Sequence, residues 1–90
     1  MKRTGSYYDV RSFDDTHGLV IRKKDSFEST VESIEDVVEC AKAQGYNNDE
    51  KWLIIRVDWE KTLDEQGIFQ KETTTRTAVG AYDNGTVTRF

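Results

Sequence analysis

The stretch DSFESTVESIEDVVECAKAQG, residues 25–45, decides the fold. Apolar side chains recur in it at alternating spacings of four and three residues, which places them along one face of a helix. This apolar stripe consists of Phe27, Val31, Ile34, Val38 and Ala41, with Val37 widening it. We therefore predict a helix over residues 26–44.

Both ends of this helix have capping signals. Asp25 is the expected N-cap, because its carboxylate can accept a hydrogen bond from a free backbone N–H of the first turn. Glu28 follows three residues later, which is the spacing of a capping box. Gly45 tolerates the left-handed conformation that commonly ends a helix.

Alternating polar and apolar residues bounded by turn residues predict strands on both sides of the helix. The predicted strands are residues 6–13, 18–24, 51–62, 68–82 and 86–90. Turn residues at 14–18 favour a hairpin between the first two strands. The pair Asn84-Gly85 predicts a type I′ turn with Tyr82 opposite Val87.

The third strand has an apolar face and a more polar face that also carries Trp52 and Ile54. One face carries Leu53, Ile55, Val57 and Trp59, and we expect this longer apolar row to face the helix. Trp52, Ile54 and Arg56 are then expected on the uncovered side of the sheet, as an exposed patch that binds a partner. The alternative is that the N-terminal hairpin or the loop near Asp64 covers them. In the fourth strand, Gly80 predicts a bulge or a close approach between elements.

The predicted class is α+β, with a four- to five-stranded antiparallel sheet, one helix on one face and the order ββαβββ. Ninety residues allow one domain, residues 1–90. This order of elements is compatible with a β-grasp arrangement and equally with an open antiparallel sheet.

Negative charge is concentrated in the helical segment. Residues 25–50 contain one lysine and eight acidic residues, whereas residues 51–90 contain six basic and six acidic ones. Glu28, Glu32, Glu35 and Glu39 recur at helical spacing beside the apolar stripe, with Asp36 next to them. Such a row either keeps a solvent-facing helix soluble or docks on a basic surface of another protein.

Basic and aromatic residues gather before the helix and suggest nucleic acid as an alternative ligand. They are Lys2, Arg3, Tyr7, Tyr8, Arg11, Phe13, Arg22, Lys23 and Lys24. The net charge of the chain, −4, weakens attraction to a polyanion, so nucleic acid is the less favoured partner.

No catalytic motif stands out. Asp14, Asp15 and His17 are too few for a zinc site, and we predict neither a cofactor nor a metal. Cys40 is the only cysteine and is expected to be partly buried on the helix. A small domain without disulfides, signal peptide or long apolar stretch is expected in the cytoplasm and not in a membrane.

These observations favour a non-enzymatic protein-interaction domain, an inhibitor or adaptor. The predicted partner is another protein with a basic surface, and the sequence leaves homo-oligomerisation open. The predicted partner-binding residues are Glu28, Glu32, Glu35, Asp36 and Glu39 on the helix, or Trp52, Ile54 and Arg56 on the sheet.

Overall fold

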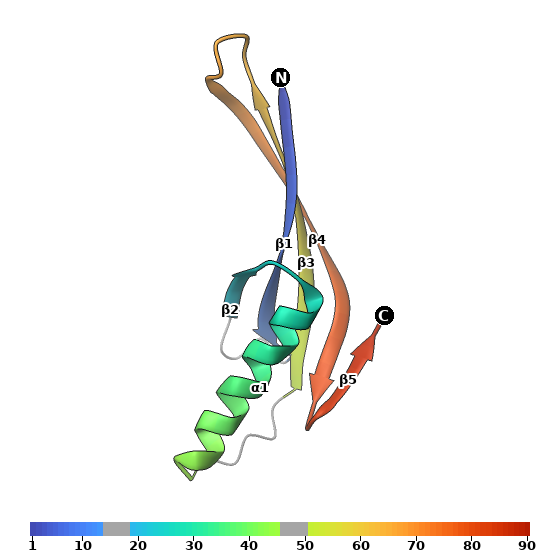
Figure 1. Cartoon of the computed structure of the whole chain (residues 1–90). Coiled ribbons are helices and arrows are strands. Elements are labelled where there is room, and N and C mark those ends of the chain that lie inside the picture. The colour runs from blue at the N-terminus through green and yellow to red at the C-terminus, as the bar shows by residue number, and fades with distance from the viewer. Residues whose placement is uncertain (14–18, 46–50) are drawn as a thin grey trace.

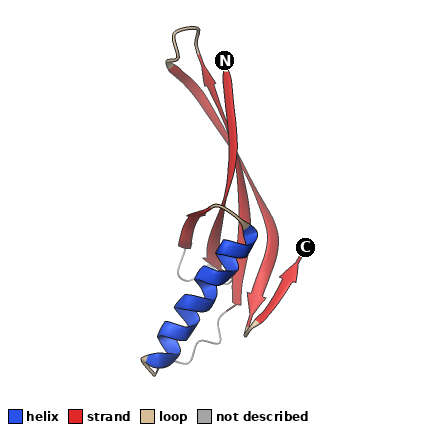
Figure 2. Ribbon diagram, in the orientation of Figure 1, coloured by secondary structure: helices blue, strands red, loops and turns tan. Residues whose placement is uncertain are grey.

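The computed structural model describes residues 1–13, 19–45 and 51–90. These residues form one helix and five strands, in the predicted order (Figures 1 and 2). The elements are β1 (Lys2–Ser12), β2 (Leu19–Lys24), α1 (Phe27–Ala43), β3 (Lys51–Leu63), β4 (Phe69–Asp83) and β5 (Thr86–Arg89). The predicted α+β class is confirmed. The turn predicted at residues 14–18 lies outside the described residues.

The strands form one open antiparallel sheet in the order β2-β1-β3-β4-β5. Of the two arrangements compatible with the element order, this is the open antiparallel sheet. The predicted turn at Asn84-Gly85 is confirmed, because both residues have positive φ and Tyr82 pairs with Val87. The register of β3 with β4 shifts between Ile54, opposite Gly80, and Ile55, opposite Ala78, so the bulge predicted near Gly80 is also confirmed.

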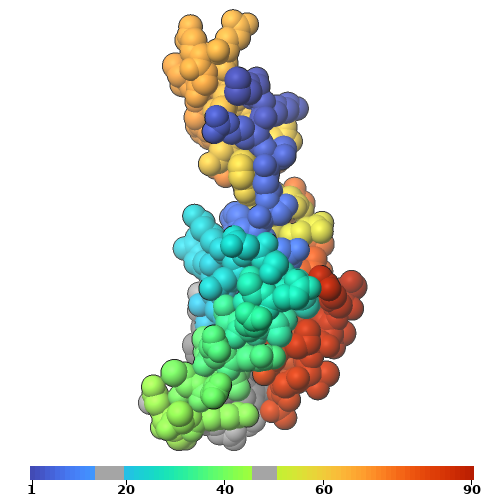
Figure 3. Space-filling model, in the orientation of Figure 1, coloured from blue at the N-terminus to red at the C-terminus, as the bar shows by residue number. Residues whose placement is uncertain are grey.

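The sheet is much longer than the helix that covers it, and the molecule extends over 55 × 26 × 23 Å. In Figure 1, α1 lies across the lower half of the sheet, and β1, β3 and β4 continue above it as a narrow, twisted sheet. We call this part the sheet extension; it consists of residues 2–6 of β1, 58–63 of β3 and 69–75 of β4. The extension is narrow in the space-filling view as well (Figure 3).

The core lies between α1 and the lower half of the sheet. Its buried members are Val10, Phe27, Ile34, Val38, Trp52, Ile54 and Tyr82. Within the helix, Thr30 is fully buried and Val37 is 40% exposed, so the buried stripe widens toward Thr30 and the predicted widening at Val37 is wrong. The Thr30 hydroxyl makes this burial tolerable because it donates to the Ser26 carbonyl at 2.6 Å.

The face of β3 that meets the helix is the opposite of the predicted one. Trp52 and Ile54 belong to the core cluster with Phe27 and Ile34, so the exposed patch predicted for them does not exist. The other row of β3 turns to the face without a helix. On that face Val57 is still buried, between Tyr7 and Arg76 in the register of β1 and β4.

The physical reason for this inversion is the short reach of α1. Beyond the helix, the face of β3 that carries Trp52 and Ile54 continues with Arg56, Asp58 and Glu60. These polar residues reach solvent beyond the part of the sheet that the helix covers, so this face needs apolar residues only beneath the helix. The longer apolar row is used instead for lateral packing between neighbouring strands.

Candidate functional site

The carboxylates predicted as a partner-binding site lie on the outer face of α1. We call Glu28, Glu32, Glu35, Asp36 and Glu39 the acidic surface; all five are exposed. In Figure 3 the helix faces the viewer in front of the sheet. The structure thus presents these side chains on one accessible element.

The start of α1 differs from the prediction. Ser26, rather than Asp25, is the N-cap: its side chain accepts from Ser29 N–H at 3.0 Å, and the Ser29 hydroxyl accepts from Ser26 N–H at 3.2 Å. This reciprocal pair replaces the predicted box with Glu28. A serine hydroxyl can both donate and accept hydrogen bonds, and it is short enough to reach the backbone groups of the first turn. Glu28 is left free to point away from the helix end, toward β5.

Glu28 is the member of the acidic surface that has a partner in the same chain. Its Oε1 lies 3.6 Å from Nη1 of Arg89 in β5. The Arg89 guanidinium also lies over the Phe27 ring, with Cζ 4.2 Å from the ring centroid. Both charged side chains are largely exposed, so this ion pair contributes little to stability. It does reduce the charge at one end of the acidic surface.

The other four carboxylates are unpaired within the part of the chain that the structure describes. Glu32, Glu35, Asp36 and Glu39 have no ion pair or hydrogen bond to residues 1–13, 19–45 or 51–90. Neighbours at helical spacing lie about 5–6 Å apart and repel one another. The acidic surface therefore carries concentrated negative charge that an external cationic group could relieve.

Of the sheet residues predicted as an alternative site, Arg56 alone is exposed. Trp52 is 6% exposed and Ile54 is fully buried, so neither can contact a partner in this structure. The Arg56 Nε lies 3.2 Å from Oδ2 of Asp58, on the helix side of the sheet. The structure does not bring Arg56 into the acidic surface, and the sheet site loses its two apolar members.

The basic residues of the alternative nucleic-acid site are separated along the sheet. Lys2 lies near the tip of the extension, where its Nζ is 3.1 Å from Oε1 of Glu60. Lys24 pairs with Tyr8, six residues further along β1, which corresponds to about 20 Å of strand. Lys2 is therefore far from Lys24 on the sheet.

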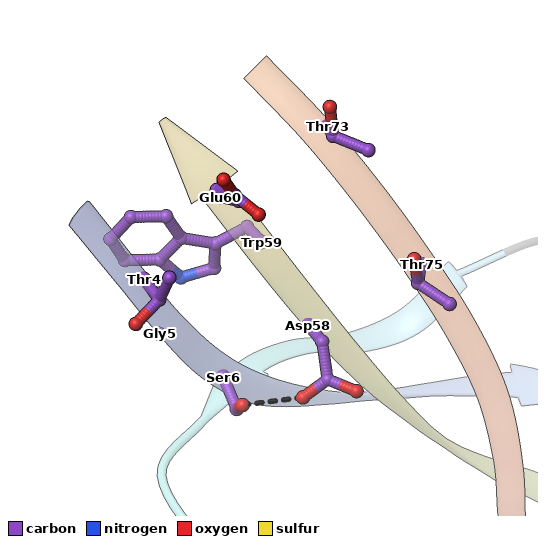
Figure 4. Close-up of a pocket in the computed structure, with 8 residues that line it drawn as sticks. All are labelled: Thr4, Gly5, Ser6, Asp58, Trp59, Glu60, Thr73 and Thr75. Carbon is purple, nitrogen blue, oxygen red and sulfur yellow. Dashed lines mark hydrogen bonds between the residues drawn. The ribbon is translucent and has the colours of Figure 1, made fainter. Parts of the chain in front are cut away.

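Sequence reasoning missed a hollow of about 300 Å³ on the sheet extension. Figure 4 shows its lining residues: Thr4, Gly5, Ser6, Asp58, Trp59, Glu60, Thr73 and Thr75. They come from three strands, and the separate alternation of each strand gives no signal that they meet. The Ser6 hydroxyl donates to Asp58 at 2.5 Å and, with Arg56 nearby, lowers the pKa of that carboxyl. Asp58 and Glu60 both have partners in the chain, which limits their use as a general acid or base.

Other chemistry-bearing residues do not converge on a site in the described part of the chain. No group of three His, Cys, Asp or Glu side chains there could hold a metal ion. Asp14, Asp15 and His17 lie outside the described residues. Cys40 is exposed, so the prediction that it is partly buried is wrong. Within the described residues, the structure has no helix of the length and apolar character needed to cross a membrane.

The fold and the acidic surface define a small α+β domain with one amphipathic helix on an open antiparallel sheet. No protein-family model, curated protein or solved structure matches the chain. Functional arguments consequently rest on the residues themselves.

Proposed function

We propose that this protein is a non-enzymatic interaction domain, an inhibitor or adaptor that docks the acidic surface of α1 on a basic surface of a partner protein. The observation that carries the proposal is the set of four exposed carboxylates, Glu32, Glu35, Asp36 and Glu39, without a partner in the described chain. The single exposed cysteine and the absence of a second one support an encounter in the cytoplasm.

Complementary charge would act mainly on the rate and selectivity of docking. A concentrated negative surface attracts a basic partner over a Debye length, about 10 Å at 0.1 M salt. Rim carboxylates that stay hydrated add modest affinity, so binding through them depends strongly on ionic strength. Salt dependence is therefore the property that distinguishes this mode from apolar docking.

Two alternatives have less support. The acidic surface could serve solubility alone, in which case its charges would have no effect on any interaction. Nucleic-acid binding would require the basic groups near Lys2 and Lys24 to act together, although the Lys2 ammonium is engaged by Glu60. An electrophoretic mobility shift at low salt with single-stranded and duplex oligonucleotides tests this second alternative.

The decisive experiment is comparative capture from a lysate of the native host. The bait variants are the wild-type chain, Glu32→Gln/Glu35→Gln on the acidic surface, and a control away from it, Glu65→Gln in the β3–β4 turn with Asp83→Asn at the end of β4, where an exposed ion pair with Lys51 is also removed. Both double variants remove two exposed carboxylates, so they change net charge equally. A specific partner should be retained by wild type and control, lost by the α1 variant, and eluted by moderate salt.

Two results would count against the proposal. The first is a partner that binds all three baits equally and resists salt, which indicates an apolar surface. The second is equal loss from both double variants, which indicates a response to net charge and not to this surface. Circular dichroism of each bait verifies that the fold is intact.

A further inference from the structure

We infer that β4 pairs, along its free edge, with β4 of a second copy of this chain in antiparallel orientation, centred on Thr74. This inference is independent of the proposed function, because the paired segment lies on the sheet extension and not on α1.

The free edge follows from the unequal lengths of β4 and β5. β4 has 15 residues, and β5 pairs only with Gly80–Asp83, while Phe90 N–H adds one hydrogen bond to the Val79 carbonyl. From Phe69 to Ala78, β4 has β3 on one side and no strand on the other among the described residues. Figure 1 shows β5 lying beside the lower part of β4 alone.

This edge lacks the backbone features that usually prevent strands from pairing. Proteins protect edges with proline, bulges, very short strands or charged side chains, and the charged residues of this edge are Lys71, Glu72 and Arg76. The chain contains no proline, and residues 71–78 keep an unbroken register with β3 between the two irregularities of that pair. The segment contains Thr73, Thr74, Thr75 and Thr77, and β-branched residues favour strands. The segment is thus a regular, exposed strand with a free edge along which another strand can pair.

Charge complementarity selects a second copy as the occupant. In the Thr74-centred register, Glu72 of each copy lies opposite Arg76 of the other, on the same face of the joined sheet. Opposite charges placed directly across from each other stabilise strand pairs. Within one chain these two side chains are four strand residues apart, about 13 Å, and cannot pair with each other. Both are exposed and lack an ion pair to other described residues.

Other registers are less favourable for the same reason. A shift that centres the pair on residue 73 puts Glu72 opposite Thr74 and Arg76 opposite Gln70, which removes both charge pairs. Centring on Glu72 or Arg76 places like charges opposite each other, which is destabilising. The free edge of β1 is a poorer self-partner, because residues 2–7 contain Lys2 and Arg3 and no acidic residue.

The same register also gives exposed apolar side chains a partner. Pairing of residues 71–77 brings Ile68, in the β3–β4 turn, and Phe69, the first residue of β4, toward Phe90 of the other copy, because Phe90 marks the point where β5 leaves the edge of β4. All three side chains are more than half exposed in the single chain. Their meeting at both ends of the joined strands would bury apolar surface.

Analytical ultracentrifugation of the full chain over a range of concentrations tests the inference through a charge exchange. Glu72→Arg places arginine opposite Arg76, and Arg76→Glu places glutamate opposite Glu72, so each single variant should be monomeric where wild type is a dimer. Mixing the two single variants restores both opposite-charge pairs, and so does the double variant Glu72→Arg/Arg76→Glu. Both should dimerise.

A cross-linking experiment tests the register. In a Cys40→Ser background, Thr74→Cys puts two thiols on directly opposed residues, about 4.5–5.5 Å apart between Cα atoms, which suits a disulfide. The matched control Thr77→Cys puts its two thiols about 20 Å apart. Oxidation should link the first variant and not the second.

Several outcomes would overturn the inference. Wild type could remain monomeric at every concentration, or the single charge variants could dimerise like wild type. Equal cross-linking of the two cysteine variants would reject the register. Open-ended polymers would indicate that β4 pairs with β1 of the next copy, which does not close. Circular dichroism excludes unfolding as the cause of any monomer.

Discussion

The Phe27 ring of α1 lies directly over the backbone of Gly80 in β4. A Cβ built on Gly80 would meet Cε2 of this ring at 2.7 Å and the Thr88 carbonyl oxygen at 2.8 Å. The position therefore requires glycine for closeness of approach, since helix, bulge and β5 converge there. This contact fixes the first turn of α1 on the sheet.

We expect Gly80→Ala to lower the free energy of unfolding by about 1–3 kcal/mol, the usual cost of adding a methyl group to a packed site. Urea denaturation followed by circular dichroism measures it. Phe27→Leu in the same chain replaces the ring by a smaller side chain and so leaves more room for the added methyl group. In a double-mutant cycle it should recover part of the lost free energy of unfolding. Strictly additive effects would show that the two residues are not coupled.

Ile34 should be the most sensitive position of the helix. It is 1% exposed and belongs to the core cluster, so Ile34→Ala should cost about 2–5 kcal/mol in the free energy of unfolding. Val37→Ala, one turn away and 40% exposed, is the matched control and should cost less than about 1 kcal/mol. Equal costs would mean that the helix is rotated relative to this structure.

The two candidate caps can be separated by single substitutions. Ser26→Ala removes the acceptor for Ser29 N–H and should cost about 1 kcal/mol. Asp25→Ala should stay within about 0.5 kcal/mol, because no cap bond depends on Asp25. Thermal unfolding of both variants measures the difference. A larger effect of Asp25→Ala would mean that Asp25, and not Ser26, is the N-cap.

Asp58 gives the sheet extension a pH dependence. The Ser6 hydroxyl bond lowers the pKa of Asp58 below the ordinary value for aspartate, about 3.9. A carboxyl with a lowered folded-state pKa contributes stability that is present above its unfolded pKa and is lost as pH falls through the folded one. The effect of Asp58 should therefore fade below about pH 4.

Ser6→Ala tests this assignment. Without the hydroxyl donor, the pKa of Asp58 should rise toward its ordinary value, as measured by an NMR titration of the side-chain carboxyl carbon. The Asp64 carboxyl is the control, because its hydrogen-bond donors are Gln66 N–H, Ile68 N–H and the Gln70 side-chain amide, and none of them is Ser6. An unchanged Asp58 titration in the variant would assign the shift to Arg56 instead.

Local signals accounted for the elements and for the position of the acidic surface. The helix period places Glu32, Glu35, Asp36 and Glu39 outside the buried stripe whatever lies beneath the helix. The turn at Asn84-Gly85 sets the register of β4 with β5 through two residues alone. Predictions of this kind succeed because all the interacting groups lie within a few residues of one another.

Such local signals could not predict which face of β3 packs on the helix. Both faces carry apolar residues, and the longer apolar row, with Leu53, Ile55 and Val57, is not the one beneath the helix. The pairing of Glu28 with Arg89 likewise joins residues far apart in the chain.

Residue order along this chain is thus sufficient to specify which segments coil, which extend and where negative charge collects, since those properties depend on near neighbours. The covered side of the sheet, the hollow beside Trp59 and the free edge of β4 exist only after distant segments pack. The reason is that a helix of 17 residues covers only one half of the sheet in a molecule 55 Å long, and the contacts that choose this half link residues from both ends of the chain.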